Sequence, residues 1–273
     1  MNRTCLIYYG RSALALLMGV RNLPSVVWGL LTRPVFTVRL KGGYRFRVRR
    51  ALDVVVLKEV ILDREYQRMG PDIEPGWTVV DIGAAHGEFA IPAARRIGDG
   101  RVIAVEPAPD TVELLRENLL LNGAEQVELV QRAIGARSGS AILNLAARGA
   151  MMNSTTVSNA KGCGIRVSMI TLAELFESAH IAHCDYLKMD CEGGEYEILT
   201  AAPNSTLQRI SRLVIEYHEG VTPYGHEDLL RRLEAAGFSV RAEAHPARPT
   251  QGWIYAQRGQ VQPSSAPSDR RGS

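Results

Sequence analysis

The sequence has few aromatic residues and no grouped cysteines, and each absence excludes a class of protein. Phe, Trp and Tyr make up 6% of the 273 residues, which argues against a surface on which nucleic-acid bases stack. The cysteines show neither a Cys-x-x-Cys pair nor the spacing of zinc ligands, so we expect a reducing compartment in which the thiols are buried or idle. They are Cys5, Cys163, Cys184 and Cys191.

A long apolar run is also missing. A membrane-spanning helix needs roughly 20 apolar residues, and the nearest candidate, residues 12–32, is interrupted by Arg21, Asn22 and Pro24. The same segment has no convincing small-residue site for cleavage as a signal peptide. We therefore predict a cytoplasmic protein, with attachment to a membrane surface as the alternative location.

Acidic residues are absent from the first 50 positions, which contain ten Lys or Arg, whereas the remainder carries 22 basic against 29 acidic residues. A basic leader thus precedes a mildly acidic body. Within it, residues 5–31 alternate apolar clusters with single arginines, which predicts two short amphipathic helices around Pro24. Such helices most often pack on the body or on a second subunit, and peripheral contact with an anionic membrane is the alternative. The oligomeric state is left open.

Residues 35–50 predict a β-hairpin around the turn at 41–43. Its second arm alternates strictly, so that one face carries Arg45, Arg47 and Arg49. That face either binds an acidic group such as a sugar phosphate or forms a solvated edge that discourages strand addition. A helix is expected over 52–66. We divide the chain into basic helices and hairpin (1–52), a main domain (53–258) and a tail rich in Gln, Pro and Ser (259–273) that we expect to be disordered.

Strands and helices alternate from residue 76 onward, which is typical of a mostly parallel sheet with helices on both faces. The segment 138–168 interrupts this alternation, and we expect it to lie as an insertion over the carboxyl ends of the strands. The predicted strands lie at 79–80, 101–107, 127–130, 186–190 and 213–217, with closing strands at 238–242 and 253–257. The predicted helices include 110–122, 196–201 and 227–236, and another begins at a capping box at 171–174.

The stretch from Thr78 to Phe89 predicts a ligand site. A buried strand ends in Asp81, and Gly83 and Gly87 then precede a helix, whose first amides can bind an anion. Asp81 adds a negative charge beside them, so a ligand with both a carboxylate and an ammonium fits. S-adenosylmethionine has both groups and NAD has neither; the spacing Gly-x-x-x-Gly also differs from the NAD fingerprint. We expect Gly83, Ala84, His86 and Gly87 to form the cofactor loop.

Glu106 is the second signal for this cofactor. It ends the next strand roughly 20 residues after the glycines, where an acid can accept both hydroxyls of a ribose. We expect the adenine to lie between this strand and the following one, near Pro107, Arg132 and Ala133.

Several motifs together resemble one family. The chain contains Val80-Asp81-Ile82-Gly83-Ala84, Val105-Glu106-Pro107, Asn118 and Asn122, Ala133-Ile134-Gly135, and above all a Lys-x-Asp-x-Glu-Gly-x-Glu block at 188–195. Over roughly residues 53–238 it resembles the FkbM-type methyltransferases. The resemblance implies a Rossmann-like class I methyltransferase fold with a seven-stranded, mostly parallel sheet. It also implies S-adenosylmethionine-dependent methylation, often of hydroxyls on sugars or natural products.

Methyl transfer to a hydroxyl needs a base, and acidic residues at strand ends are candidates. Asp190 is the first choice as base or acceptor-positioning group, and it could instead orient the amine of the cofactor. Glu192 and His218 could share the catalytic work. With Glu216 they also form a possible set of metal ligands, although we do not favour a divalent metal. His86 is a further candidate base, with a structural role in the cofactor loop favoured.

The sequence therefore predicts an S-adenosylmethionine-dependent O-methyltransferase that acts on a hydroxyl of a sugar, a glycosylated metabolite or another natural product. Its partner would be a small-molecule or glycan acceptor rather than a nucleic acid. An N-methyltransferase is the alternative within the same class. A non-catalytic binding protein docked through its basic N-terminus is the alternative outside it.

Overall fold

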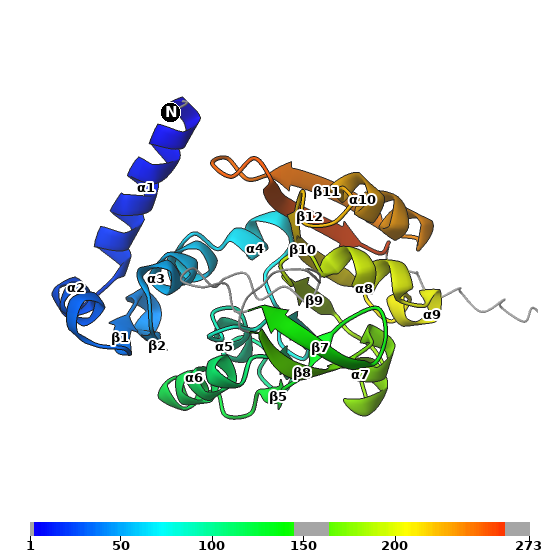
Figure 1. Cartoon of the computed structure of the whole chain (residues 1–273), viewed down its shortest axis with the longest axis horizontal. Coiled ribbons are helices and arrows are strands. Elements are labelled where there is room, and N and C mark those ends of the chain that lie inside the picture. Colours follow the sequence, from blue (N-terminus) through cyan, green and yellow to red (C-terminus); the bar gives the residue numbers. More distant parts are fainter. Residues whose placement is uncertain (1–2, 145–163, 260–273) are drawn as a thin grey trace, which may run out of the picture.

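The computed structural model describes residues 3–144 and 164–259. Its centre is a seven-stranded sheet in the order β11-β12-β10-β9-β3-β4-β5 (Figure 1). Neighbouring strands from β10 to β5 run parallel, and β12 is antiparallel to both β10 and β11. The strands are β3 (Thr78–Ile82), β4 (Arg101–Val105), β5 (Glu128–Val130), β9 (Tyr186–Met189), β10 (Arg212–His218), β11 (Ser239–Ala244) and β12 (Gln251–Gln257).

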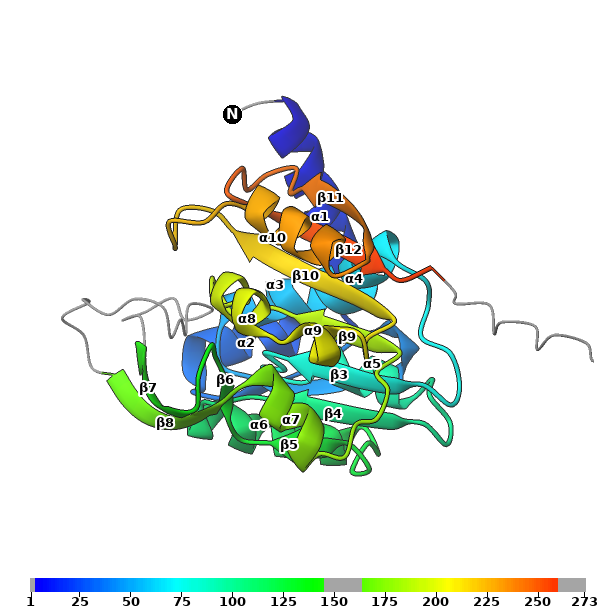
Figure 2. The same cartoon turned by 90° about the vertical axis from the view of Figure 1, so that its right-hand side faces the viewer.

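Successive residues of the central strands point to opposite faces of the sheet, since the side-chain period of a strand is two. Val79 and Val102 belong to one core cluster, whereas Val80 and Ile103 belong to the other. All four are buried. The sheet is therefore covered on both faces (Figure 2), and the predicted Rossmann-like α/β fold is confirmed.

The helices of this layered arrangement follow the strands in the expected places. The first core cluster includes residues of α3 (Ala51–Leu57), α5 (Ala90–Ala94) and α6 (Pro109–Leu121). The second includes residues of α7 (Leu172–Ser178), α8 (Glu195–Ala201), α9 (Asn204–Leu207) and α10 (His226–Ala235). The capping box predicted at Thr171 is present, because its side chain accepts a hydrogen bond from Glu174 N.

The N-terminal part contains α1 (Arg3–Gly19), α2 (Leu23–Thr32) and a hairpin of β1 (Phe36–Arg39) and β2 (Arg45–Val48) joined by η1 (Lys41–Gly43). Its inner residues Phe36, Val38 and Phe46 belong to the same core cluster as α5. No helix within the described residues is long and apolar enough to cross a membrane. The domain division at residue 52 stays a prediction.

Asn118 of α6 and Asn122, which directly follows this helix, bind the free edge of β2. Asn118 accepts a hydrogen bond from Arg47 N at 2.6 Å and donates to its carbonyl oxygen. Asn122 makes the same pair of bonds with Arg45, at 3.1 Å and 2.6 Å. Side-chain amides thus supply the donors and acceptors that a further strand would offer, which protects this edge.

The helix predicted over 52–66 is wrong, because three elements replace it: α3, the π-helical turn η2 (Lys58–Leu62) and α4 (Glu65–Met69). The break lies at Arg64, which has a left-handed φ of 56°. No Gly, Pro or Asn marks this position, so the sequence carried no signal for it. The turn redirects the chain so that Tyr66 reaches the carboxyl end of the sheet, where its hydroxyl lies 3.0 Å from Glu216 Oε2.

The segment predicted as an insertion contains β7 (Gly139–Asn144) and β8 (Gly164–Ile170), which pair antiparallel. β8 also pairs with β6 (Ala133–Ile134), so a separate three-stranded sheet forms beside the main one. Residues 145–163, in the middle of the predicted insertion, lie outside the described residues, as does the predicted tail from 260 onward.

Candidate active site

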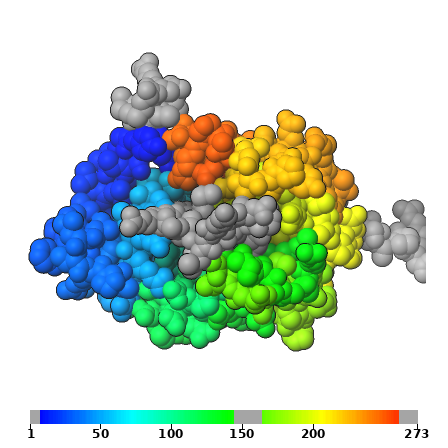
Figure 3. Space-filling view, in the orientation of Figure 1, coloured from blue at the N-terminus to red at the C-terminus, as the bar shows by residue number. Residues whose placement is uncertain are grey.

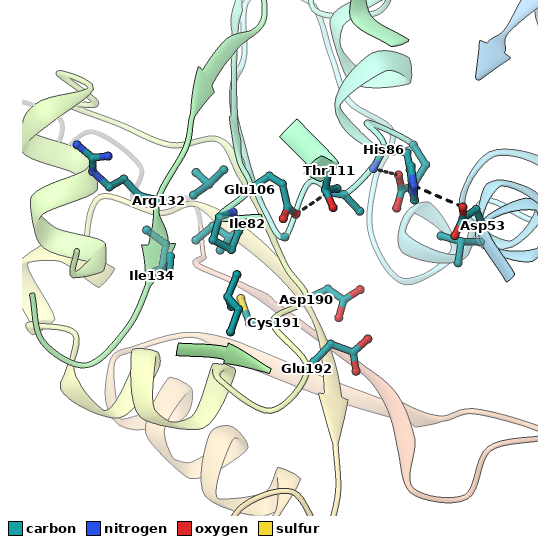
Figure 4. Close-up of a pocket in the computed structure, with 18 residues that line it drawn as sticks. Asp53, Ile82, His86, Glu106, Thr111, Arg132, Ile134, Asp190, Cys191 and Glu192 are labelled. Carbon is teal, nitrogen blue, oxygen red and sulfur yellow. Dashed lines mark hydrogen bonds and ion pairs between the residues drawn. The ribbon is translucent and has the colours of Figure 1, made fainter. Parts of the chain in front are cut away.

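A pocket opens where the central parallel strands end (Figure 4). Its empty volume is about 940 Å³, counting the solvent space at its open mouth. Its lining comes from the loops after β3, β4 and β9, with additions from α3, from residues 132–134 and from β7. An open parallel sheet binds ligands in this place, so the fold and the pocket agree.

The loop after β3 forms one wall. Gly83 has a φ of +79°, and a Cβ there would lie 1.9 Å from the carbonyl oxygen of Asp190. Only glycine allows the ends of β3 and β9 to approach so closely. Gly87, with a φ of +88°, packs against Leu115 and Ile91 and does not line the pocket; nor does Ala84, which is buried. Gly87 and Ala84 therefore help to fix the conformation of the loop and do not contact the pocket.

Glu106 lies at the end of β4, as predicted, and faces the pocket. It accepts hydrogen bonds from Ala85 N at 3.1 Å and from Ala108 N at 2.9 Å. Burial raises the pKa of Glu106 to about 7, although the two amide donors lower it. A carboxylate held in this way by its backbone keeps lone pairs available to accept hydroxyl groups of a ligand. Pro107, Arg132 and Ala133 line the pocket near it.

Asp81 does not line the pocket, contrary to the expectation that it contacts an ammonium group of the ligand. It is fully buried and its Oδ1 lies 3.2 Å from Lys188 Nζ. Lys188 also donates a 2.7 Å hydrogen bond to Gly83 O. Burial lowers the pKa of Lys188, but the carboxylates of Asp81, Asp190 and Glu88 raise it above its ordinary value. The buried pair of Asp81 and Lys188 therefore stabilises the glycine loop through the hydrogen bond to Gly83 O.

His86 lines the pocket, with Nε2 3.6 Å from Asp53 Oδ2. Burial lowers the pKa of His86, and Arg49 and Arg50 lower it further, against an opposite effect of Asp53. Its backbone N–H donates to Glu88 Oε2 at 3.0 Å. These contacts support the structural role for His86 in the cofactor loop.

The loop after β9 forms the opposite wall and explains the Glu-Gly-x-Glu part of the motif. Glu195 is fully buried and accepts hydrogen bonds from Cys191 N at 2.5 Å and from Gly193 N at 2.8 Å. Gly193 has a φ of +100°, and a Cβ there would lie 2.6 Å from Val221. Glu192 also adopts a left-handed φ, of 52°. Strained backbone of this kind is concentrated at functional sites, and here it turns Glu192 into the pocket.

Asp190 and Glu192 carry their carboxylates side by side on this wall (Figure 4). Asp190 Oδ2 lies 3.2 Å from the hydroxyl of Tyr66, which also contacts Glu216. Asp190 Oδ1 is buried and has no hydrogen-bond partner among the described residues. A buried carboxylate oxygen without a partner lacks compensation for its lost hydration, so the Asp190 carboxylate at the pocket wall can accept a proton or a hydrogen bond.

His218 lies behind this wall and does not line the pocket. Its Nε2 is 3.3 Å from Glu192 Oε2, and its Nδ1 is 3.8 Å from Glu195 Oε1. Burial lowers the pKa of His218, but the surrounding carboxylates Glu195, Asp190 and Glu192 raise it to about 10. His218 therefore orients the carboxylate of Glu192 through this ion pair and does not contact a ligand itself.

Asp190, Glu192 and His218 can each offer one ligand atom to a metal ion, and these atoms lie within 4.8 Å of one another. Carboxylate and imidazole donors suit several divalent cations. A histidine must be neutral to act as a ligand, whereas the three surrounding carboxylates favour its protonated form. The geometry therefore allows a divalent metal, which would have to displace the proton of His218.

Comparisons with known proteins agree with this site. The model of the FkbM methyltransferase domain matches residues 81–240, which include the glycine loop, Glu106 and the whole Lys188–Glu195 block. This match covers more than half of the chain. The protein belongs to the FkbM methyltransferase family.

Two relatives illustrate the range of the family. The chain is similar to the 31-O-demethyl-FK506 methyltransferase FkbM of Streptomyces tacrolimicus, with 27% identity over 248 residues, 78% of this chain and 92% of the relative. It is also similar to the hexuronic acid methyltransferase AglP of Haloferax volcanii, with 28% identity over 160 residues, 59% of this chain and 62% of the relative. A crystal structure of methyltransferase FkbM from Methylobacillus flagellatus aligns with a TM-score of 0.47 and 15% identity, over 74% of this chain and 53% of that chain.

This FkbM-type protein is thus an S-adenosylmethionine-dependent methyltransferase, and its pocket fits that cofactor. Glu106 offers a buried carboxylate at the position expected for ribose hydroxyls, and the Gly83–Gly87 turn leaves room beside it. Three predicted residues lie behind the surface: Asp81, Ala84 and Gly87. The others predicted for the cofactor line the pocket, namely Gly83, His86, Glu106, Pro107, Arg132, Ala133 and Asp190.

Several contributors to the site were not predicted. Glu88 directly follows the glycine loop, and Cys191 lies between two predicted acids, so position alone could have indicated both. Asp53 lines the pocket from α3, and Tyr66 contacts Asp190 from α4. These two come from a segment that precedes the glycine loop in the chain, and no local pattern links that segment to the site.

Proposed function

We propose that this FkbM-type methyltransferase methylates a hydroxyl group on a sugar, a glycosylated metabolite or another hydroxylated natural product. The observation that carries the proposal is the carboxylate of Asp190, which lines the pocket and whose Oδ1 has no hydrogen-bond partner among the described residues. Two relatives, named for the methylation of 31-O-demethyl-FK506 and of a hexuronic acid, support this class of acceptor. The first name indicates methylation of an oxygen, and a hexuronic acid carries both hydroxyl and carboxyl groups.

S-adenosylmethionine supplies an electrophilic methyl group on a sulfonium centre. Glu106 binds the ribose hydroxyls, and the turn from Gly83 to Gly87 accommodates the amino-acid portion. The protein aligns the acceptor with the methyl group, and alignment alone can contribute a large part of the rate.

An alcohol is a weak nucleophile until its proton is removed. Asp190 accepts the hydroxyl proton at Oδ1, while Tyr66 holds Oδ2 and so fixes the orientation of the carboxylate. Glu192, held by His218, hydrogen-bonds a neighbouring hydroxyl of the acceptor. Asp190 is the catalytic residue, and His218 is a positioning residue.

The test replaces Asp190 with asparagine, which keeps the shape and removes the base. Methyl transfer is expected to fall roughly 100- to 10,000-fold, the usual contribution of general-base catalysis, while S-adenosylmethionine affinity measured by calorimetry stays within about threefold. The matched control is Asp99→Asn, the same change at an exposed aspartate. Acceptors are found by mass spectrometry of extract incubated with isotopically labelled cofactor.

The outcomes separate the alternatives. Full activity of Asp190→Asn on a hydroxyl acceptor overturns the role of Asp190. Labelled methyl groups on nitrogen identify an N-methyltransferase, because a neutral amine attacks without a base. Cofactor binding without any labelled product favours a binding protein. Activity that disappears with EDTA and returns with a divalent cation supports a metal at Asp190, Glu192 and His218.

A further inference from the structure

The two N-terminal helices expose an unusual share of the apolar surface. Among the described residues, eight of the thirteen exposed large hydrophobic side chains lie between positions 9 and 32. Figures 1 and 3 show these helices at one end of the molecule, projecting beyond the sheet. They are Tyr9, Leu14, Leu17 and Met18 on α1 and Val27, Trp28, Leu30 and Leu31 on α2; we call this set the apolar arm.

Several large apolar side chains of α1 are exposed. Leu17 is 63% exposed. Leu14 and Met18 are also more than half exposed and lie at the edge of a hollow between α1 and residues 58–68. The inward face uses a small residue, because a Cβ at Gly19 would collide with Leu62. Packing on the body therefore does not account for the large outward side chains.

On α2 the same division is found. Val26 is buried, and a Cβ at Gly29 would lie 2.5 Å from Phe36, so a narrow face packs on the hairpin. Trp28 and Leu31 point outward and are 61% and 77% exposed. The helix contains no charged residue. A tryptophan next to exposed leucines is typical of a helix that lies in the interface of a bilayer.

Positive charge surrounds the apolar arm. Arg11, Arg21, Arg33 and Arg39 are exposed, and the first 50 residues contain no acid. Two copies joined through the same patch would bring these arginines together, because a twofold interface places the same surface on both subunits. An anionic lipid surface instead attracts each of them. Charge complementarity thus favours a membrane over a second copy.

We propose that the apolar arm docks the protein on the surface of an anionic membrane. Leucine, methionine and tryptophan side chains of α1 and α2 enter the interface, and the flanking arginines contact lipid phosphates. Neither helix has to cross the bilayer, in agreement with the lengths of α1 and α2.

The experiment is flotation of the full-length protein with vesicles. Binding is expected with phosphatidylcholine vesicles that contain about a third phosphatidylglycerol, and it should weaken at high salt as lipid charges are screened. Each exposed arginine replaced by glutamine should lower the partition coefficient about fivefold. The pair Trp28→Glu and Leu31→Glu should lower it at least roughly tenfold.

The control variant is Tyr224→Glu with Leu120→Glu, which introduces the same two charges in place of an aromatic and a leucine side chain that are 45% and 64% exposed outside the apolar arm. It should float like the unchanged protein. Circular dichroism and binding of S-adenosylmethionine establish that each variant is folded, and neither measurement depends on the acceptor.

Two results overturn the proposal. The first is absence of the protein from all vesicle fractions, including the most anionic ones. The second is a dimer in light scattering that Trp28→Glu and Leu31→Glu convert to a monomer, without flotation of the unchanged protein; the arm is then an interface between copies. Methyl transfer to a soluble acceptor is measured separately, so its failure does not affect this test.

Discussion

Alanine in place of Gly83 would press against the backbone of Asp190. The added Cβ would lie 1.9 Å from the carbonyl oxygen of Asp190, whereas carbon and oxygen atoms of neighbouring strands stay about 3.3 Å apart or more. The two strand ends must therefore separate by more than about 1 Å. Overpacking of this kind costs about 1–3 kcal/mol, and the left-handed φ of +79° costs roughly 1–2 kcal/mol more for a residue with a Cβ.

Gly43→Ala is the matched control. Gly43 has almost the same φ, +77°, but nothing lies within 4 Å of its added Cβ. This substitution measures the conformational cost alone, about 1–2 kcal/mol. The difference between the two variants in free energy of unfolding isolates the contact with Asp190, and we expect about 1–3 kcal/mol.

Urea-induced unfolding measures both costs, and initial rates measure the effect on catalysis. A shift of about 1 Å in a catalytic group can lower the rate roughly 100-fold, so Gly83→Ala should lose methyl transfer to that extent while Gly43→Ala retains it. Equal destabilisation by the two substitutions, with methyl transfer unchanged in both, would refute the idea that close approach at Gly83 positions Asp190.

Three further predictions concern charged groups. Glu106→Gln should weaken S-adenosylmethionine binding roughly tenfold or more in calorimetry; affinity of the unchanged protein should fall below about pH 7, where Glu106 gains a proton, and the variant should lack this dependence. Burial raises the pKa of both Glu65 and Glu88 from 4.5 to about 8. The folded state then binds more protons than the unfolded state, so the Tm of the cofactor-free protein should fall between about pH 5 and about pH 8; a rising Tm contradicts this. Glu195→Gln should lower the free energy of unfolding, measured in urea, by about 1–3 kcal/mol, because it weakens the hydrogen bonds from Cys191 N and Gly193 N. Unchanged stability would show that the loop after β9 does not depend on Glu195.

The cofactor half of the site could be predicted because its residues follow one another closely in the chain. The glycine turn and Glu106 end neighbouring parallel strands, so strand periodicity and spacing were sufficient to bring them together. The direction of Asp81 was not predictable in this way. Asp81 would end its strand in the same place whether its side chain faced the ligand or the interior. Its inward direction depends on the buried ammonium of Lys188, more than 100 positions away in the chain.

The acceptor half depends on contacts that no local pattern encodes. Tyr66 reaches Asp190 only because the chain breaks at Arg64, a residue type that rarely adopts a left-handed conformation. His218 ends a predicted strand, yet its side chain turns to Glu192 and Glu195 behind the wall. Long-range packing determined both outcomes.

The wall formed by residues 82–134 and the wall formed by residues 190–192 meet at Gly83 and Asp190, and each also has supports of its own. The first rests on Lys188 and the backbone of β4, and the second on Glu195 and His218. Asp53, Val56 and Leu143 join the pocket from elements outside both loops. Asp53 contacts His86 of the glycine loop and Leu143 belongs to the same core cluster as Ala133, so exchange of either side chain would change the shape of the cofactor side of the pocket.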